Sequence, residues 1–284
     1  MAAHPLALAR SLLFVPADRP ERYAKALATA AHGVLIDLED AVAPAQRDAA
    51  RAALQRAWEG VAPAERGRVA VRINGTGTPW HDADAALVRA LVASGLGAVV
   101  VPKAERAAPL AALAAACPGV ALLPLIESAE GAARLDEIAA APQVLRLAFG
   151  HIDLQADMGM ACGADEAELA PLRWAIVLAS RRAGLASPVD GVTTDTGDAT
   201  LLAADTARAR RFGFGAKLCI HPAQIAGVHA AYAPSAEQRA WAQRVLAAAQ
   251  AAQGGVCVVE GRMVDAPVIA LARQTLHGGP EAFA

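Results

Sequence analysis

Eight short runs of apolar residues recur along the chain, and segments with helical periodicity separate each run from the next. Each run has the length and the flanking turn residues of a buried strand. The runs cover residues 11–16, 33–39, 68–74, 98–103, 121–127, 144–150, 188–192 and 216–221. Eight strand–helix units over roughly 230 residues are typical of a (β/α)₈ barrel, because an open sheet of this length more often has five to seven strands. The first run is not followed by Gly-x-Gly-x-x-Gly, so a dinucleotide-binding sheet is the weaker alternative. The sequence therefore predicts an α/β fold, a (β/α)₈ TIM barrel.

The pattern changes after the eighth run. A helix-like segment, 236–252, leads to a short extended piece, 256–260, and a last helix-like segment, 267–276. A barrel needs only one closing helix at this point, so the tail is additional. We expect residues 1–232 to form the barrel and residues 233–284 to form a C-terminal helical arm or lid. Such arms cover an active site or bind a neighbouring subunit.

Charge and cysteine content exclude several classes of partner. The chain carries 26 basic and 28 acidic residues, a balance that gives no reason to expect binding to nucleic acid or to an anionic membrane. No apolar run approaches the roughly 20 residues of a membrane helix, and the N-terminus lacks the pattern of a signal peptide. The four cysteines form no Cys-x-x-Cys pair, so we expect reduced thiols in a cytoplasmic protein.

Two strand-like runs end in single carboxylates. Glu127 follows the fifth run and Asp153 follows the sixth. The carboxyl ends of barrel strands meet at one rim, and two carboxylates completed by water and substrate oxygens are a common way to hold Mg²⁺. The alternative is that each acid caps the helix that follows it. Histidine and cysteine clusters with the spacing of a zinc site are absent from the sequence.

A second acidic group, Asp37, Glu39 and Asp40, ends the second run. We expect Asp37 and Glu39 to bind substrate indirectly, by orienting metal-bound water or basic neighbours. The alternative, which can hold at the same time, is a salt-bridge network with Lys103 or Arg72.

Two arginines are candidates for binding an anion. Arg72 falls on the predicted inner face of the third strand, where a buried guanidinium needs an anionic partner. That partner is a substrate carboxylate or a developing enolate, or else Asp37 or Glu39. Arg19, in the loop after the first strand, is placed to meet a phosphate or carboxylate, and the alternative is an ordinary surface arginine.

Three further residues lie near the predicted rim or in the arm. His221 ends the eighth run and is more often a structural histidine than a base. Lys217 starts the same run, at the face of a barrel that usually serves stability. Asp265 precedes Pro267 in the arm, which is the pattern of a helix start, but a lid would also bring a proton donor to this place.

These residues together resemble the citrate lyase beta-subunit-like family of CoA-ester lyases, within the HpcH/HpaI aldolase superfamily, which includes malyl-CoA and citramalyl-CoA lyases. The matching segments occur in the same order over nearly the whole chain. They are residues 10–20, 36–42, 71–75, 101–103, 125–128, 149–154, 217–222 and 261–267.

The resemblance implies a barrel that assembles as a homotrimer or hexamer, with Mg²⁺, or Mn²⁺ as an alternative, held by Glu127 and Asp153. It implies that Arg72 steadies the thioester oxygen as an enolate forms, and that Asp265 is a catalytic acid or base that often reaches the adjacent subunit. Arg19 lies where relatives contact coenzyme A or substrate.

The activity implied is reversible cleavage of a 3-hydroxy-carboxyacyl thioester, such as malyl-CoA, citramalyl-CoA or a citryl thioester, into an acyl-CoA and an oxoacid. Two alternatives stay open: a malyl-CoA-type thioesterase, and a citrate lyase subunit whose substrate arrives on an acyl carrier protein. Many relatives carry an acid directly before the metal-binding aspartate, where this chain has Ile152. The substrate preference shaped by that loop therefore cannot be carried over from the family.

Overall fold

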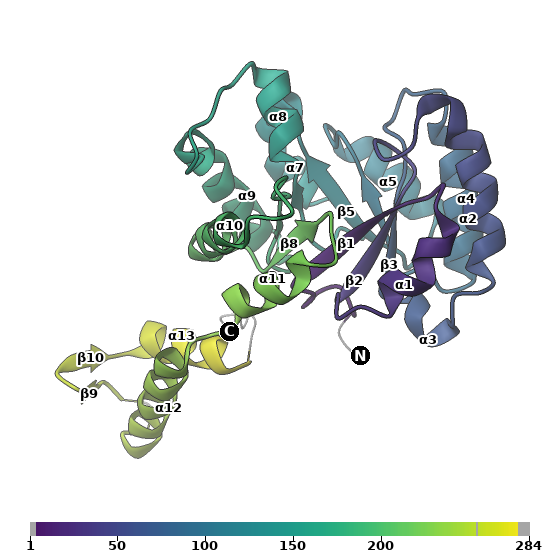
Figure 1. The fold of residues 1–284 in the computed structure, drawn as a ribbon. Helices are drawn as coiled ribbons and strands as arrows, with labels where there is room; N and C mark the ends of the chain where they lie inside the picture. Colours follow the sequence, from purple (N-terminus) through teal and green to yellow (C-terminus); the bar gives the residue numbers. More distant parts are fainter. Residues whose placement is uncertain (1–3, 254, 278–284) are drawn as a thin grey trace. The chain divides into compact units, whose positions relative to one another are not determined.

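Eight parallel strands form a closed barrel in sequence order in the computed structural model, which describes residues 4–253 and 255–277 (Figure 1). The last strand pairs with the first, Lys217 lying opposite Ser11. The strands are β1 Ser11–Pro16, β2 Gly33–Asp37, β3 Val69–Arg72, β4 Ala98–Val101, β5 Ala121–Ile126, β6 Ala148–Phe149, β7 Val189–Asp190 and β8 Ala216–Cys219. Every predicted run contains one of these strands, so the predicted (β/α)₈ barrel is confirmed.

Helical segments follow the strands and surround the barrel (Figure 1). They are η1 Pro20–Arg22, α1 Tyr23–Leu27, η2 Pro44–Gln46, α2 Arg47–Trp58, α3 Pro63–Arg66, α4 His81–Ala93, α5 Ala107–Ala116, α6 Ala129–Ala133, α7 Leu135–Ala139, α8 His151–Met158, η3 Ala167–Leu169, α9 Ala170–Arg182, α10 Ala199–Phe212 and α11 Gln224–Tyr232. Helix α10 shows how the sequence sets their ends. The side chain of Asp198 accepts hydrogen bonds from the amides of Thr200 and Leu201, and Gly213 ends the helix with a φ of 103°.

Small and branched apolar side chains fill the barrel interior. They come from alternate positions of the strands: Leu12, Leu35, Ala70, Ala98, Val100, Ala121, Leu123, Leu125, Ala148, Val189, Ala216 and Leu218. This alternation is what the pleat of a strand requires. Below them, at the N-terminal ends of the strands, fully buried Arg146 donates to the carbonyl oxygens of Leu6 and Ala9, at 2.9 Å each. The bottom of the barrel is therefore closed by the segment that precedes β1.

The chain forms two compact units, residues 1–230 and 231–284. In the second unit, α12 Ala236–Ala251 and α13 Ala266–His277 enclose a small apolar core with a hairpin of β9 Cys257–Val259 and β10 Arg262–Val264. Both helices and the first strand agree with the sequence prediction. Strand β10 was not predicted. Among the residues that the structure describes, no helix is long and apolar enough to cross a bilayer.

Candidate active site

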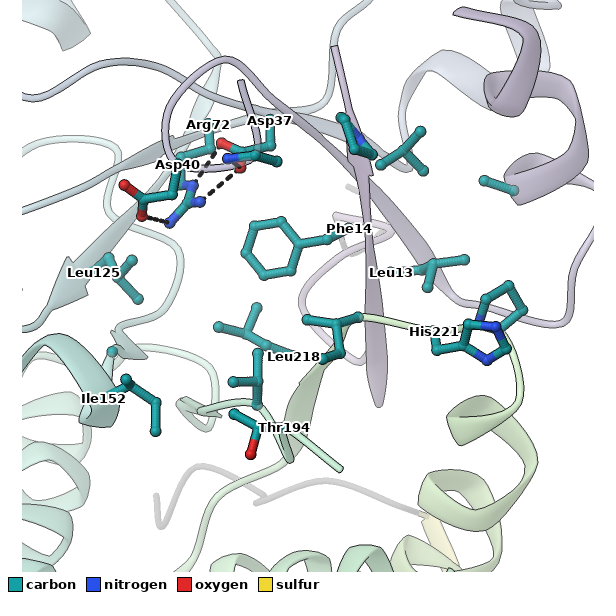
Figure 2. A pocket seen from close by; sticks show the side chains of 18 of the residues that line it. Leu13, Phe14, Asp37, Asp40, Arg72, Leu125, Ile152, Thr194, Leu218 and His221 are labelled. Atoms are coloured by element: carbon teal, nitrogen blue, oxygen red, sulfur yellow. Dashed lines mark hydrogen bonds and ion pairs between the residues drawn. The ribbon is translucent and has the colours of Figure 1, made fainter. Parts of the chain in front are cut away.

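A cavity of about 980 Å³ lies at the C-terminal ends of the barrel strands, and its lining residues all belong to the first unit. Side chains from the ends of β1, β2, β3, β5 and β8, from α8, and from the segment after β7 contribute to its wall (Figure 2). The helical segments η1 and α1 add one basic residue each, Arg22 and Lys25. This rim is where barrel enzymes place their chemistry.

Glu127 and Asp153, the two predicted metal ligands, both line this cavity. Glu127 follows β5 and is 3% exposed, and its Oε1 accepts a hydrogen bond of 2.7 Å from the backbone amide of Lys103. Asp153 lies in the first turn of α8. Gly150 precedes that helix, and a Cβ atom there would lie 2.5 Å from Glu127 Oε2. The close approach of the two segments that carry the carboxylates thus depends on a glycine.

The charge at this end of the barrel fits a divalent cation. Five carboxylates gather here, those of Asp37, Glu39, Asp40, Glu127 and Asp153, against two cationic side chains, Arg72 and Lys103. Within this contacting group the acids exceed the cations by three; Arg22 and Lys25, elsewhere on the cavity wall, reduce the excess for this whole end of the barrel to one. All five acids are oxygen ligands, the type that Mg²⁺ and Mn²⁺ prefer.

Burial raises the pKa of Glu127 to about 8, and the charges of Glu39 and Asp153 add to this effect. Burial likewise raises the pKa of Glu39 to about 7, although Arg72 acts against it. A cation bound beside these carboxylates would favour their charged forms. Within residues 4–253 and 255–277 no group of three or more histidine, cysteine or acidic side chains could hold a metal ion. Glu127 and Asp153 would supply two carboxylates to such a cation, and water or substrate oxygens would complete the coordination.

Arg72 is held by the acidic group that follows β2. Its Nε and Nη2 donate to the two carboxylate oxygens of Asp37, at 2.7 and 2.6 Å, and Nη1 lies 3.2 Å from both Glu39 and Asp40 (Figure 2). Asp37 also accepts from the backbone amides of Glu39 and Ala41, at 3.0 Å each. The salt-bridge alternative for these acids is therefore present in the structure. Because Arg72 also lines the cavity, it remains available to a substrate anion.

Lys103 connects the two acidic groups; its ion pair with Glu39 was among the sequence alternatives, but its backbone bond to Glu127 was not predicted. Its backbone amide holds Glu127, and its ammonium lies 3.4 Å from Glu39 Oε1. Its φ of 45° places it in the left-handed region, where a residue with a side chain is uncommon. Strain of this kind is often found at functional sites.

The segment that carries Asp153 is fixed from behind by a buried ionic network. His151 Nε2 lies 3.3 Å from Glu166 Oε1, and Glu166 Oε2 in turn pairs with Arg173 and with Arg208, the latter at 2.7 Å. Burial acts to raise the pKa of Glu166, but His151 and Arg173 lower it to about 2. On the other side of His151, a Cβ atom on Gly191 would lie 2.0 Å from its Nδ1, so the ring fits closely against that backbone.

Arg19 and His221, two further sequence candidates, differ in their relation to the cavity. Arg19 is exposed, pairs with Glu21 at 3.8 Å and is not among the residues that line the cavity; Arg22 and Lys25, one and two turns further on, are. His221 does line it.

Two residues have structural partners instead. Lys217 is buried, donates to the carbonyl oxygen of Gly191 at 2.8 Å and lies 3.6 Å from Asp190. Asp265 belongs to the second unit, where its Oδ1 accepts a hydrogen bond of 3.4 Å from the amide of Val268, in the first turn of α13. It therefore caps this helix, as its sequence context indicates.

Comparison with known proteins identifies the family of this chain. Residues 10–222 match the family model described as HpcH/HpaI aldolase/citrate lyase. The chain is 41% identical over 275 residues to a citrate lyase subunit beta-like protein of Mycobacterium tuberculosis, with 95% of each chain covered. It is 36% identical to a (3S)-malyl-CoA thioesterase of Cereibacter sphaeroides, over 96% of this chain and 94% of that protein.

Among solved structures, the protein CitE of Mycobacterium tuberculosis in complex with magnesium, acetoacetate and coenzyme A matches with a TM-score of 0.83. It is 39% identical, and the match covers 97% of this chain and 100% of that one. The relatives and the solved structure match over nearly the full length of the chain, and the family model matches residues 10–222. The chain belongs to the HpcH/HpaI aldolase/citrate lyase family.

Proposed function

We propose that this protein is a divalent-metal-dependent CoA-ester lyase. It would cleave, reversibly, the C–C bond of a 3-hydroxy-carboxyacyl thioester to give an acyl-CoA and a 2-oxoacid. The observation that carries this proposal is the presence of Glu127, Asp153 and Arg72 on the wall of one cavity at the C-terminal rim. It is supported by the related CitE protein, whose complex contains magnesium, acetoacetate and coenzyme A.

Glu127 and Asp153 would hold Mg²⁺, with Mn²⁺ as an alternative. When bound, the cation supplies Lewis acidity, which lowers the pKa of the substrate hydroxyl and stabilises the carbonyl group that forms from it. Loss of the hydroxyl proton and cleavage of the C–C bond leave the electron pair on the α-carbon of the acyl-CoA. That carbon then takes up one proton, so the reaction needs no oxidant or reductant.

Arg72 would stabilise the thioester oxygen as negative charge develops on it. The two-point contact with Asp37 fixes the plane of the guanidinium, at 2.6 and 2.7 Å. The two ion pairs of Nη1, with Glu39 and Asp40, are longer, at 3.2 Å. This Nη1 group is therefore the one that can exchange a carboxylate for a substrate oxygen at least cost.

Asp265 would donate the proton to the α-carbon, from the arm of a neighbouring subunit in a homotrimer or hexamer. This assignment rests on the family resemblance of residues 261–267. It can be tested by mixing two inactive variants, Asp265→Asn and Arg72→Lys. If the aspartate acts on its neighbour's site, mixed oligomers regain activity; if each site uses its own aspartate, mixing restores none.

Two other functions have specific support. The relative named (3S)-malyl-CoA thioesterase favours hydrolysis of the thioester in the same site. A citrate lyase subunit beta of Leuconostoc mesenteroides, 32% identical over 95% of this chain, favours a subunit that receives its substrate on an acyl carrier protein. These alternatives differ in products and in carrier.

The test is an assay of purified protein with malyl-CoA and citramalyl-CoA, in Mg²⁺ and in EDTA, that follows coenzyme A and oxoacid separately. A lyase forms oxoacid and acetyl-CoA in equal amounts and only with metal. Free coenzyme A without oxoacid would identify a thioesterase. Turnover confined to an acyl-carrier thioester would identify a citrate lyase subunit.

A further inference from the structure

Ile152 is a large apolar residue that lies exposed beside a candidate metal ligand. Its relative exposure is 45%, it precedes Asp153 directly, and both residues line the cavity. Further apolar side chains line the same cavity: Phe14, Leu125, Val192 and Leu218. Figure 2 shows Phe14, Leu125, Leu218 and Ile152 around its open centre. Apolar surface of this kind gains free energy when an alkyl group of a ligand covers it.

Two basic residues and a histidine of the cavity come from another part of the rim. Arg22 belongs to η1 and Lys25 to α1, both after β1, and His221 follows β8. Ile152 follows β6, which is separated from β1 by β7 and β8 in the barrel order. In Figure 2 Ile152 and His221 lie on opposite sides of the view. A ligand carboxylate beside Ile152 would therefore lie away from Arg22, Lys25 and His221.

Arg72 is the other cation on the cavity wall among the residues described, and three carboxylates already surround it. Within the group of contacting side chains around Arg72 and Glu127, five acids face two cations, Arg72 and Lys103, so a divalent metal bound there leaves one negative charge uncompensated. A substrate carboxylate bound to the metal adds to that charge. A second substrate carboxylate placed beside Ile152 would lose its hydration without gaining a cationic partner.

We infer that Ile152 determines specificity, by contacting a small alkyl group on the hydroxyl-bearing carbon of the substrate. The substituent on that carbon is then a short alkyl group and not a hydrogen atom or a carboxymethyl group. The oxoacid released carries the same alkyl group. This inference rests on the proposed lyase function and defines its substrate class. One methyl group in an apolar pocket changes kcat/KM by roughly 10- to 200-fold.

The first test compares citramalyl-CoA, which has a methyl group at this carbon, with malyl-CoA, which has hydrogen. We expect the wild-type protein to favour citramalyl-CoA by about tenfold or more in kcat/KM. Ile152→Ala should reduce this ratio severalfold. Ile220→Ala is the matched control, because Ile220 is 40% exposed and lines the same cavity after β8. It should leave the ratio of the two substrates unchanged.

A second test measures binding without turnover. In the presence of Mg²⁺, calorimetric titration should give tighter binding of pyruvate than of glyoxylate or oxaloacetate, and Ile152→Ala should remove this order. Equal or reversed preference in the wild-type protein would overturn the inference, as would a ratio that Ile220→Ala lowers as much as Ile152→Ala. If neither ester is cleaved, the proposed function fails, and the order of oxoacid binding still decides the role of Ile152.

Discussion

Gly150→Ala is the substitution that tests most sharply how the two metal-binding segments fit together. The φ of Gly150 is −95°, a value that alanine adopts freely, so the change adds a methyl group without backbone strain. That methyl carbon would lie 2.5 Å from Glu127 Oε2 and 2.6 Å from Glu127 Cβ. Ordinary contact begins near 3.4 Å, so the Cβ contact alone requires the two segments to separate by about 0.8 Å. Rotation of the glutamate cannot relieve the clash, because its Cβ is fixed to β5.

A displacement of this size moves the segments that carry Glu127 and Asp153 relative to each other. We expect the affinity for Mg²⁺ to fall about tenfold or more, as it does when groups that orient a ligand are disturbed. A misplacement of about 1 Å at the reacting groups costs on the order of 10²-fold in kcat. The added volume should lower the free energy of unfolding by about 1–3 kcal/mol. Calorimetric titration of Mg²⁺, steady-state kinetics and thermal melting in EDTA measure the three effects.

Gly75→Ala provides the matched control. Gly75 follows β3 at the same end of the barrel, and a Cβ atom there meets nothing within 4 Å. This variant should keep wild-type metal affinity, turnover and stability. If Gly150→Ala behaves like Gly75→Ala in all three measurements, the close approach of Gly150 to Glu127 does not set the metal site, and the reasoning is wrong.

Three further predictions concern protons and charge. Burial raises the pKa of Glu127 to about 8, so a cation displaces a proton below that pH, and Mg²⁺ affinity should rise with pH by up to about tenfold per unit until about pH 8. The unfolded chain loses this proton at lower pH than the folded chain, so the metal-free melting temperature should fall between about pH 5 and 8. An affinity independent of pH would show that Glu127 is not a ligand. Arg72→Lys loses the two-point contact with Asp37 and should lower kcat/KM by about 10²-fold; near-normal kinetics would exclude Arg72 from the reaction. Asp265→Asn retains a good helix cap, so kcat should fall while the melting temperature and Mg²⁺ affinity hold; a lower melting temperature with normal kcat would leave Asp265 a capping role alone.

The barrel could be predicted because each of its strands is buried on both faces. Such strands are short, continuous apolar runs, and eight of them separated by helix-sized segments leave few other folds. The lengths of the strands are harder to predict from the sequence. The sixth run, 144–150, contributes only Ala148–Phe149 to the sheet, while Val144 makes an isolated bridge to Leu122. Apolar composition cannot show where hydrogen bonding between strands stops.

The site could be predicted where it depends on strand direction. Glu127 and Arg72 come from the ends of strands, and alternation along a strand indicates which way they face. What Arg72 contacts could not be decided, because the pairing with Asp37 depends on the register of β2 against β3. Loop arginines are harder still. Arg19 does not line the cavity, whereas Arg22 and Lys25 do, and nothing in the sequence shows the rotation of helical segments as short as η1 and α1.

The network behind His151 was not accessible to sequence reasoning at all. Glu166 pairs with Arg173 and Arg208, which belong to α9 and α10. These residues follow no periodic pattern, and only the folded chain brings them together. The same holds for the left-handed backbone of Lys103, which no glycine marks.

Titration of the protein with Mn²⁺, followed by electron paramagnetic resonance, tests the central claim most directly. We expect one Mn²⁺ site per chain in the wild-type protein, and we expect Mg²⁺ to compete with Mn²⁺ for this site. Binding should be lost in both Glu127→Gln and Asp153→Asn, while their melting temperatures in EDTA stay close to wild type. Wild-type Mn²⁺ affinity in both variants would contradict the assignment of the metal to this cavity, and with it the proposed lyase mechanism.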